Sequence, residues 1–595
     1  MKEDIYARRV TKILIVFSAL YIAALFVYSN FLVPRPYYIQ TTDIENGYYY
    51  DARLIYNGLP TRTVTHPATP LFYIYSNFFI FTGDDIASTQ EFLRIIYFAQ
   101  AVFNILVLMF FIRLMPKTQS RAVDVFALSF ILASPSFLTY QDYIGADSLI
   151  IILGLPYLLF VYELIRSERK SPRSFLLLGL FTGFVIASKF SFLLLAIPSF
   201  IALALAVYLQ KDWRSIKRLA LLPFVALASF LFFISRVVYR MPSIINQVVF
   251  RDNLSNVSGI SGFAKALAAN ANYLFLNRPV FSLAISIIIF SFASLFIIFS
   301  SKLIRKKISF SDEDKKIIPQ LMLGLFGIAA LAFTLVSSGD IPGNMAKGEE
   351  LGVLLRNIAL PLLIFPFMVM TIIQVARRIG WELNKKTYFI LITLGLLLIS
   401  ESVLKHVSYR DHLIESTLER IKKTDEKLLS FAPKGENFAI WATDAKYAFG
   451  PATFHYWGNH KYAWNSFDAE LRKTFDPVEF FQFRVAGQLV GQNRLDVIDR
   501  NYALPKILQD NAKLARLYLW WRAKFPSPKE TDNILTGEDF GENPKAIMFP
   551  EAEREISQKD DTKLIEFLEY RFGYKFTKRI ESIEGRDWTI FTAAD

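Results

Sequence analysis

The sequence predicts a polytopic α-helical membrane protein that carries a charged domain at its C-terminal end. Of the 595 residues, 53% are hydrophobic and 15% are aromatic, whereas only 20% are charged. The mean hydropathy is +0.32. The apolar residues come in runs of about twenty, the length that crosses the hydrocarbon core of a bilayer. Residues 406–595 have a different composition, with more charged and turn-forming residues.

Eleven apolar runs are long enough to be membrane-spanning helices, and none has the alternation of a β-barrel strand. The first follows a basic stretch but lacks a small-residue cleavage pattern, so we expect an uncleaved span instead of a signal peptide. The fifth and sixth are separated only by "SKFS". The eleven runs cover residues 13–33, 93–115, 122–139, 148–165, 174–188, 190–209, 219–239, 279–301, 317–336, 354–375 and 387–404.

Lys and Arg gather in alternate connections between these runs. Examples are the N-terminal tail and the connections at 166–173, 211–218, 302–316 and 377–386. By the positive-inside rule this pattern predicts a multi-pass protein of the inner or plasma membrane, with the N-terminus cytoplasmic and residues 406–595 extracytoplasmic. The net charge of +13 therefore reflects topology, and we expect no nucleic-acid partner. The chain has no cysteine, which excludes disulfides and a thiol nucleophile.

Two domains follow from this division. Residues 1–405 form a transmembrane domain with surface helices in its first outer loop, and residues 406–595 form a soluble extracytoplasmic domain. Within the second domain, "NFAIWAT" and "AIMFP" are typical of short buried strands, and "DTKLIEFLEYRF" of an amphipathic helix. We expect a compact α/β or α+β fold for it.

The first outer loop concentrates polar residues in a chain that is otherwise apolar. Its stretch "TTDIENGYYYDARLIYNGLPTRTVTHPATPL" contains Asp43, Glu45, Asp51 and His66. The part "IENGYYYDARLIYNG" predicts a short amphipathic helix that lies flat on the membrane with its tyrosines at the interface. In the simplest interpretation Asp43 caps this helix, Glu45 stabilises its first turn and Asp51 is solvated.

The order of motifs suggests more than a capped helix. An acidic pair opens the loop, a Tyr-rich helix follows, and then come "NGLP", "THPATPL" and "FTGDDIASTQEFLRIIYFAQAVF". This order resembles the GT-C superfamily of polyprenyl-phosphate-sugar glycosyltransferases, in particular the bacterial branch related to protein mannosyltransferases and lipid A sugar transferases. The resemblance covers the layout of residues 10–405, and its motifs cluster in residues 40–195. It implies a GT-C fold for the transmembrane domain.

The resemblance also assigns roles to residues. Asp43 matches the catalytic base of the first outer loop, and Glu45 lies where many members carry a second acid, which leaves open which of the two is the base. The substrate-binding positions that the resemblance implies are His66 in "THPATP", Asp147 in "YIGADSLI", Lys189 in "ASKFSFLLLAIP" and Arg356 in "LLRNIALPLL". At the last motif Asn357 replaces the Tyr of the family pattern.

This chemistry needs acids and cations together at the outer membrane surface. A carboxylate accepts the proton of the attacking hydroxyl, and Arg or Lys stabilises the departing lipid phosphate. Arg94, at the start of the second span, is a further candidate cation. As alternatives, Arg94 and Lys189 snorkel to the headgroups and Asp147 caps the fourth span. The sequence requires no cofactor, although paired acids can hold a divalent cation such as Mg²⁺ or Mn²⁺.

The function predicted from these features is transfer of a hexose or pentose from a polyprenyl-phosphate donor to a hydroxyl of a glycan, glycolipid or protein, with inversion. Two alternatives remain open. One is a polysaccharide ligase or polymerase that uses a diphosphate-linked donor. The other is a transporter or flippase for a lipid-linked sugar, which would place ionisable residues at mid-membrane. The predicted spans are almost free of charge at their centres, which disfavours transport.

Overall fold

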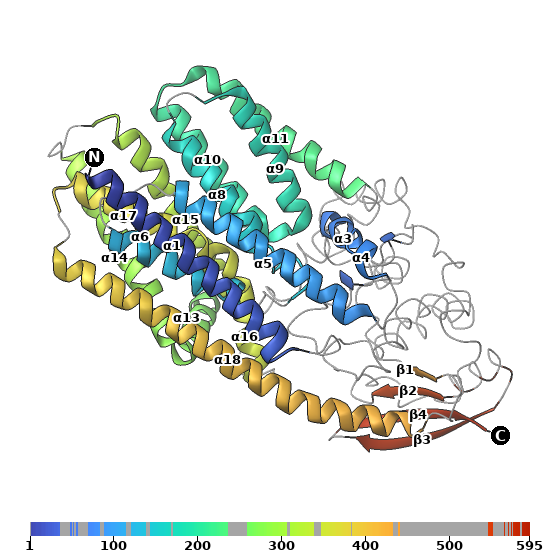
Figure 1. Ribbon diagram of the computed structural model, residues 1–595. Coiled ribbons are helices and arrows are strands. Elements are labelled where there is room, and N and C mark those ends of the chain that lie inside the picture. The colour runs from blue at the N-terminus through green and yellow to red at the C-terminus, as the bar shows by residue number, and fades with distance from the viewer. Residues whose placement is uncertain are drawn as a thin grey trace.

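The computed structural model is mostly helical and ends in a small sheet (Figure 1). It describes only part of the chain, and every structural statement below refers to that part. The described residues are 2–35, 48, 49, 52, 55, 56, 69–83, 88–114, 121–138, 143–167, 170–235, 259–305, 310–337, 347–381, 384–431, 438–440, 546–550, 565, 569, 573, 575–583 and 586–594.

Within the described residues, eight helices are long and apolar enough to cross a membrane. The first joins α1 (Lys2–Val27) to the π-helix η1 (Tyr28–Leu32), and another joins the 3-10 helix η3 (Phe190–Phe192) to α10 (Leu193–Leu209). The others lie in α5 (Thr89–Leu114), α11 (Trp213–Ile234), α14 (Pro279–Ile304), α15 (Asp314–Ser337), the pair α16 (Lys347–Leu362) and α17 (Phe365–Arg378), and α18 (Lys385–Leu429).

The other three predicted runs also form helices, but each is shorter than eighteen residues. Run 122–139 forms α6 (Arg121–Leu132) and α7 (Pro135–Leu138), which are separated at Ala133 and Ser134. Runs 148–165 and 174–188 form α8 (Ile150–Arg166) and α9 (Pro172–Ser188), of 17 residues each. Since Pro172 occupies the first turn of α9 and Ser171 accepts a hydrogen bond from the Ser174 backbone N–H, the start of α9 is fixed by its own sequence.

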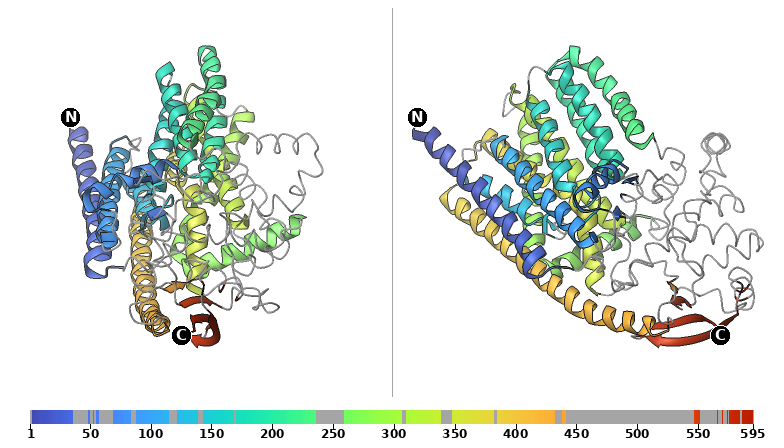
Figure 2. Two further views of the ribbon diagram at one scale, coloured as in Figure 1. Left: turned by 90° about the vertical axis from the view of Figure 1, so that its right-hand side faces the viewer. Right: turned by 45° about the vertical axis from the view of Figure 1, so that its right-hand side comes forward.

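The helices pack into one bundle with two distinct ends (Figures 1 and 2). The N-terminus lies at one end. The other end carries the short helices α3 (Thr69–Ser76) and α4 (Phe79–Thr82), the crosswise helix α13 (Gly259–Asn277), and the sheet. We call these the basic end and the sheet end, because the connections rich in Lys and Arg lie at the first.

Hydrogen bonds join neighbouring connections at the basic end. The Lys170 ammonium donates to the side chain of Gln210 and to the carbonyl of Ser167, and Arg218 donates to the carbonyl of Lys170 at 2.7 Å. Burial lowers the pKa of Lys170 below its ordinary value. Farther along the chain, Arg378 binds Asp314 through two parallel hydrogen bonds of 2.8 and 2.9 Å.

Two glycines bring α9 and α11 close together. Gly179 and Gly183 are four residues apart on α9, and both face α11. A Cβ at Gly183 would meet the carbonyl oxygen of Ala226 and would lie 2.5 Å from the backbone nitrogen of Phe230. Small residues at this spacing allow membrane helices to pack with their backbones close together. The short helix α9 therefore makes extensive contact with α11.

Helix α18 links the bundle to the sheet. It runs without interruption from Lys385 to Leu429, so the predicted domain boundary at 405/406 falls inside a helix. Phe431 follows it, and the guanidinium of Arg579, on strand β3 (Phe576–Ile583), lies 4.8 Å from the centre of the Phe431 ring. This contact places the sheet at the far end of the helix, as Figure 1 shows.

The sheet has the order β1-β2-β4-β3. Strands β1 (Phe438–Ile440) and β2 (Ala546–Pro550) are parallel, and they confirm the two strands predicted from "NFAIWAT" and "AIMFP". The antiparallel pair β3 and β4 (Arg586–Ala593) was not predicted, although the alternation in "RDWTIFTA" and the Glu584-Gly585 connection are typical of a hairpin. Of the predicted helix "DTKLIEFLEYRF" only Ile565 and Glu569 are described, and both are helical.

Candidate functional site

A buried ion pair lies at the sheet end of the bundle. The ammonium group of Lys189 donates to the carboxylate of Asp147, 42 residues earlier in the chain. The side chain of Asp147 is 1% exposed and that of Lys189 is 15% exposed. Moving a charged group out of water is costly unless an opposite charge lies beside it. The pairing therefore explains how the carboxylate of Asp147 and the ammonium group of Lys189 can both be buried.

Backbone breaks place both partners of this pair at helix ends. Asp147 belongs to the turn that precedes α8, and its carbonyl accepts a hydrogen bond from Ile150 N at 3.2 Å. Lys189 has an extended backbone between α9 and η3. The separation of the fifth and sixth predicted spans at "SKFS" is therefore confirmed. The alternative in which Lys189 snorkels to the headgroups is disfavoured, because its ammonium group binds a buried carboxylate.

Polar side chains of other elements surround the turn that holds Asp147. Gln100 of α5 donates to the Ser148 hydroxyl at 3.0 Å, and Ser148 donates to the carbonyl of Gly145 at 2.8 Å. The Tyr75 hydroxyl of α3 donates to the same carbonyl at 3.5 Å. Burial raises the pKa of Tyr75 to about 12, so its hydroxyl stays protonated and can donate. The turn is thereby held by α5 and by α3, which lies between the first two candidate spans.

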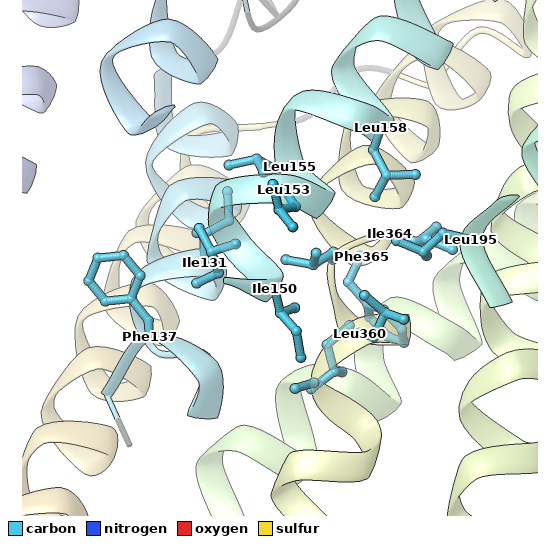
Figure 3. Packing of buried hydrophobic residues seen from close by; sticks show 14 of the residues in the cluster. Ile131, Phe137, Ile150, Leu153, Leu155, Leu158, Leu195, Leu360, Ile364 and Phe365 are labelled. Atoms are coloured by element: carbon cyan, nitrogen blue, oxygen red, sulfur yellow. The ribbon is translucent and has the colours of Figure 1, made fainter. Parts of the chain in front are cut away.

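Helix α16, which carries Arg356, packs against α8 and α10 beside this turn. A Cβ at Gly154 of α8 would lie 3.3 Å from Phe192 and 3.7 Å from Leu195, and it would also meet Leu363, just after α16. Figure 3 shows Ile150 of α8 and Leu360 of α16 in the same apolar cluster. Arg356 lies one helical turn before Leu360, so its backbone belongs to the helix that flanks the turn of Asp147.

The described tyrosines Tyr48 and Tyr49, between the first two candidate spans, are buried inside the protein. Tyr48 and Tyr49 are helical, as predicted, but they are only 3% and 2% exposed. The Tyr49 ring lies 5.3 Å from that of Phe92 on α5, and the Tyr49 hydroxyl accepts a hydrogen bond from Thr89 at 3.0 Å. The prediction of interfacial tyrosines is therefore wrong for these two, because Phe72 of α3 packs against Tyr48, and Phe79 of α4 and Phe92 of α5 pack against Tyr49.

Arg94 lies apart from the ion pair. It is exposed on α5, and its guanidinium carbon is 6.0 Å from the centre of the Phe31 ring in η1. Phe31 is itself 61% exposed. This environment matches the snorkelling alternative for Arg94, in which a cation at a span end reaches the headgroup region over an aromatic ring.

Asp43, Glu45 and His66 fall outside the described residues, so their predicted roles stay predictions. Two described elements bracket them in the chain, since η1 ends at Leu32 and α3 begins at Thr69. The described residues contain no group of three or more His, Asp or Glu side chains that could hold a metal ion. A divalent cation at the first-loop acids remains open.

Sequence reasoning missed several polar residues that organise the sheet end. Arg410 of α18 donates to the Val33 carbonyl from Nε at 3.0 Å and from Nη2 at 2.8 Å. Glu401 of α18 accepts from the backbone nitrogens of Val280 and Phe281, at 2.9 Å each. A signal was present, because Glu401 lies inside the eleventh apolar run and Arg410 lies six residues after it, and ionisable residues in a span are costly.

Two comparisons with known proteins found no match for this chain. No protein-family model matches it, and no curated protein sequence matches it. A function for this chain can therefore be inferred only from its residues and their geometry.

Proposed function

We propose that this chain is an integral membrane glycosyltransferase of the GT-C type. It would move a hexose or pentose from a polyprenyl-phosphate donor to an acceptor hydroxyl on the extracytoplasmic face, with inversion. The acceptor would be a glycan, a glycolipid or a protein. The proposal goes beyond the architecture described above, a mostly helical chain with eight candidate spans among the described residues.

One observation carries the proposal: residues of the first and second outer loops meet at the sheet end. Tyr75, nine residues after His66, contacts the carbonyl of Gly145, two residues before Asp147. The Asp147–Lys189 pair thus lies close to the end of the loop that carries Asp43 and Glu45. A transferase needs such a cluster of acids and bases at the membrane surface, where a lipid-anchored sugar would project.

The topology in this proposal has eleven spans. Besides the eight candidate spans, α6 with α7, α8 and α9 would cross the membrane. A helix of 17 residues rises about 25 Å, close to the thickness of the hydrocarbon core. The basic end would face the cytoplasm and the sheet end the outside of an inner or plasma membrane. Residues 406–595 would then be extracytoplasmic.

Each proposed residue has a chemical task. Asp43 or Glu45 accepts the proton of the attacking hydroxyl while the sugar–phosphate bond breaks. Lys189 and Arg356 stabilise the negative charge of the departing lipid phosphate, as charge-assisted hydrogen bonds do. Asp147 holds the ammonium group of Lys189 in place. His66 and Arg94 would contact the sugar and the lipid headgroup, respectively.

Sugar transfer by the purified protein tests the proposal. We would supply polyprenyl-phosphate donors that carry a labelled hexose or pentose, and compare wild type with Asp43→Asn, Glu45→Gln and Asp51→Asn. Asp51 is the matched control, an acid of the same loop with no proposed role. Loss of transfer by about two orders of magnitude in Asp43→Asn or Glu45→Gln, with donor binding retained, would identify the base.

The other outcomes would decide between the alternatives. Transfer only from a diphosphate-linked oligosaccharide would favour a ligase or polymerase. Movement of a lipid-linked sugar across liposomes without any transfer would favour a transporter or flippase. The geometry disfavours transport, because the charges of the Asp147–Lys189 pair lie at helix ends and not at the centre of a span.

A further inference from the structure

A buried arginine lies at the corner between α13 and α14. Arg278 separates the crosswise helix α13 from the span α14, a corner that lies at the sheet end (Figure 2). The residue is only 5% exposed. Its Nε atom is buried and has no hydrogen-bond partner among the residues that the structure describes. A buried guanidinium nitrogen without a hydrogen-bond partner is costly, and an anion bound at this position would remove that cost.

The nearest described carboxylate serves another purpose. Glu401 of α18 accepts hydrogen bonds from the backbone N–H groups of Val280 and Phe281, in the first turn of α14. Among the described residues, no carboxylate oxygen lies within 4.0 Å of the Arg278 guanidinium. Burial lowers the pKa of Arg278, and the charge of Glu401 offsets this only in part.

A second unpartnered polar group lies one helical turn farther along α14. The hydroxyl of Ser282 is buried and has no hydrogen-bond partner, and the residue is 7% exposed. Its backbone N–H donates to the Arg278 carbonyl at 2.9 Å, which fixes the two residues in adjacent turns. A guanidinium and a hydroxyl so placed are the donors that a phosphate oxygen accepts from.

An apolar stripe leads away from this corner along α14. Leu283, Ile287 and Phe290 are 48%, 40% and 76% exposed, and their spacing of four and three residues puts them on one helix face. On the other side of the corner, Phe275 and Leu276 of α13 are 49% and 70% exposed. A lipid combines an anionic phosphate with apolar chains, and this corner places a buried cation between the exposed apolar residues of α13 and those of α14.

We infer that Arg278, assisted by Ser282, binds the phosphate of a bilayer phospholipid whose acyl chains lie along the exposed face of α14. The inference does not depend on the proposed transferase activity. It assigns to the α13–α14 corner the task of holding one lipid at a fixed position beside the sheet end.

Native mass spectrometry of the purified, delipidated full chain tests this inference. The probes are phosphatidylglycerol, diacylglycerol with the same acyl chains, and inorganic phosphate. The variants are Arg278→Gln and Ser282→Ala, and Lys265→Gln is the matched control, an exposed cation of α13. We expect wild type and the control to retain one phosphatidylglycerol. Arg278→Gln should weaken this binding about 10- to 100-fold, the range for charge-assisted hydrogen bonds.

Three results would overturn the inference. They are equal binding of phosphatidylglycerol and diacylglycerol by wild type, equal retention by Arg278→Gln and wild type, and displacement of the lipid by inorganic phosphate at the same concentration. If Arg278→Gln does not fold, the comparison of the two lipids on wild type still decides, because the lipids differ only in the headgroup. Arg278→Lys then supplies a charged variant that should keep part of the preference.

Discussion

The guanidinium of Arg410 on α18 holds the Val33 carbonyl, 377 residues away, just beyond the π-helix at the end of the first span. The neighbouring Asp411 accepts a hydrogen bond of 3.0 Å from the Tyr28 hydroxyl. The helix that leads to the C-terminal sheet therefore also fixes the end of the first candidate span, where the connection to α5 begins. In the proposed transferase, this contact would couple the C-terminal domain to the loop that carries Asp43.

Arg410→Gln should destabilise the protein by about 2 kcal/mol, because the partly buried Val33 carbonyl loses its charge-assisted donors. Thermal unfolding in detergent measures this effect. Lys405→Gln, an exposed cation on the same helix, is the control and should unfold like wild type. Equal midpoints for Arg410→Gln and the control would show that the contact does not hold the helices together.

The Asp147–Lys189 pair should behave as a unit in a double-mutant cycle. Asp147→Asn or Lys189→Met alone leaves one buried charge without its partner and should cost about 3–5 kcal/mol. The double variant should recover most of that loss. Denaturant unfolding of the four proteins in detergent gives the coupling energy.

Additive effects in this cycle would contradict the buried pair. Measuring sugar transfer by the double variant distinguishes a structural role of the pair from a catalytic one. If Lys189 stabilises the leaving phosphate, the double variant should be stable and yet inactive. A stable double variant with full activity would restrict the pair to a structural role.

Gly183→Ala should weaken the packing of α9 on α11. The added methyl group would meet backbone atoms of Ala226 and Phe230, which cannot move as a flexible side chain can. We expect a loss of about 1–3 kcal/mol, the usual range for overpacking. Thermal unfolding checks it against Leu180→Ala, a change at a residue 44% exposed on the same helix. A stability of Gly183→Ala at or above that of wild type would argue against close contact.

Trp588→Ala should unfold the sheet selectively. Trp588 of β4 is 1% exposed and pairs with Pro550 of β2 and Glu581 of β3. Removing so large a buried side chain costs about 3–5 kcal/mol. Limited proteolysis should then cleave the C-terminal region faster while the bundle stays intact. Ile580→Ala, at a position 57% exposed on β3, should leave the cleavage rate unchanged.

The sequence determined the helical elements well, because each depends on a local property. All eleven apolar runs are helical, and the break at Lys189 lies where "SKFS" interrupts two runs. Strands β1 and β2 were likewise visible as short apolar segments. The antiparallel pair β3 and β4 was missed although the alternation in "RDWTIFTA" is a local signal for a strand. The helices α6, α8 and α9 are short because helix caps and backbone breaks end them early.

Only the tertiary structure decided which polar residues meet. Asp147 and Lys189 are 42 residues apart, and Gln100 and Ser148 are 48 residues apart. The sequence around each of these residues does not indicate which distant residue it contacts. Tyr48 and Tyr49 were read as interfacial because amphipathic helices on membranes look alike in sequence, whether lipid or protein covers them. Burial is a property of the packed bundle, and it is burial that turns an ordinary charge such as Arg278 into a group that needs a partner.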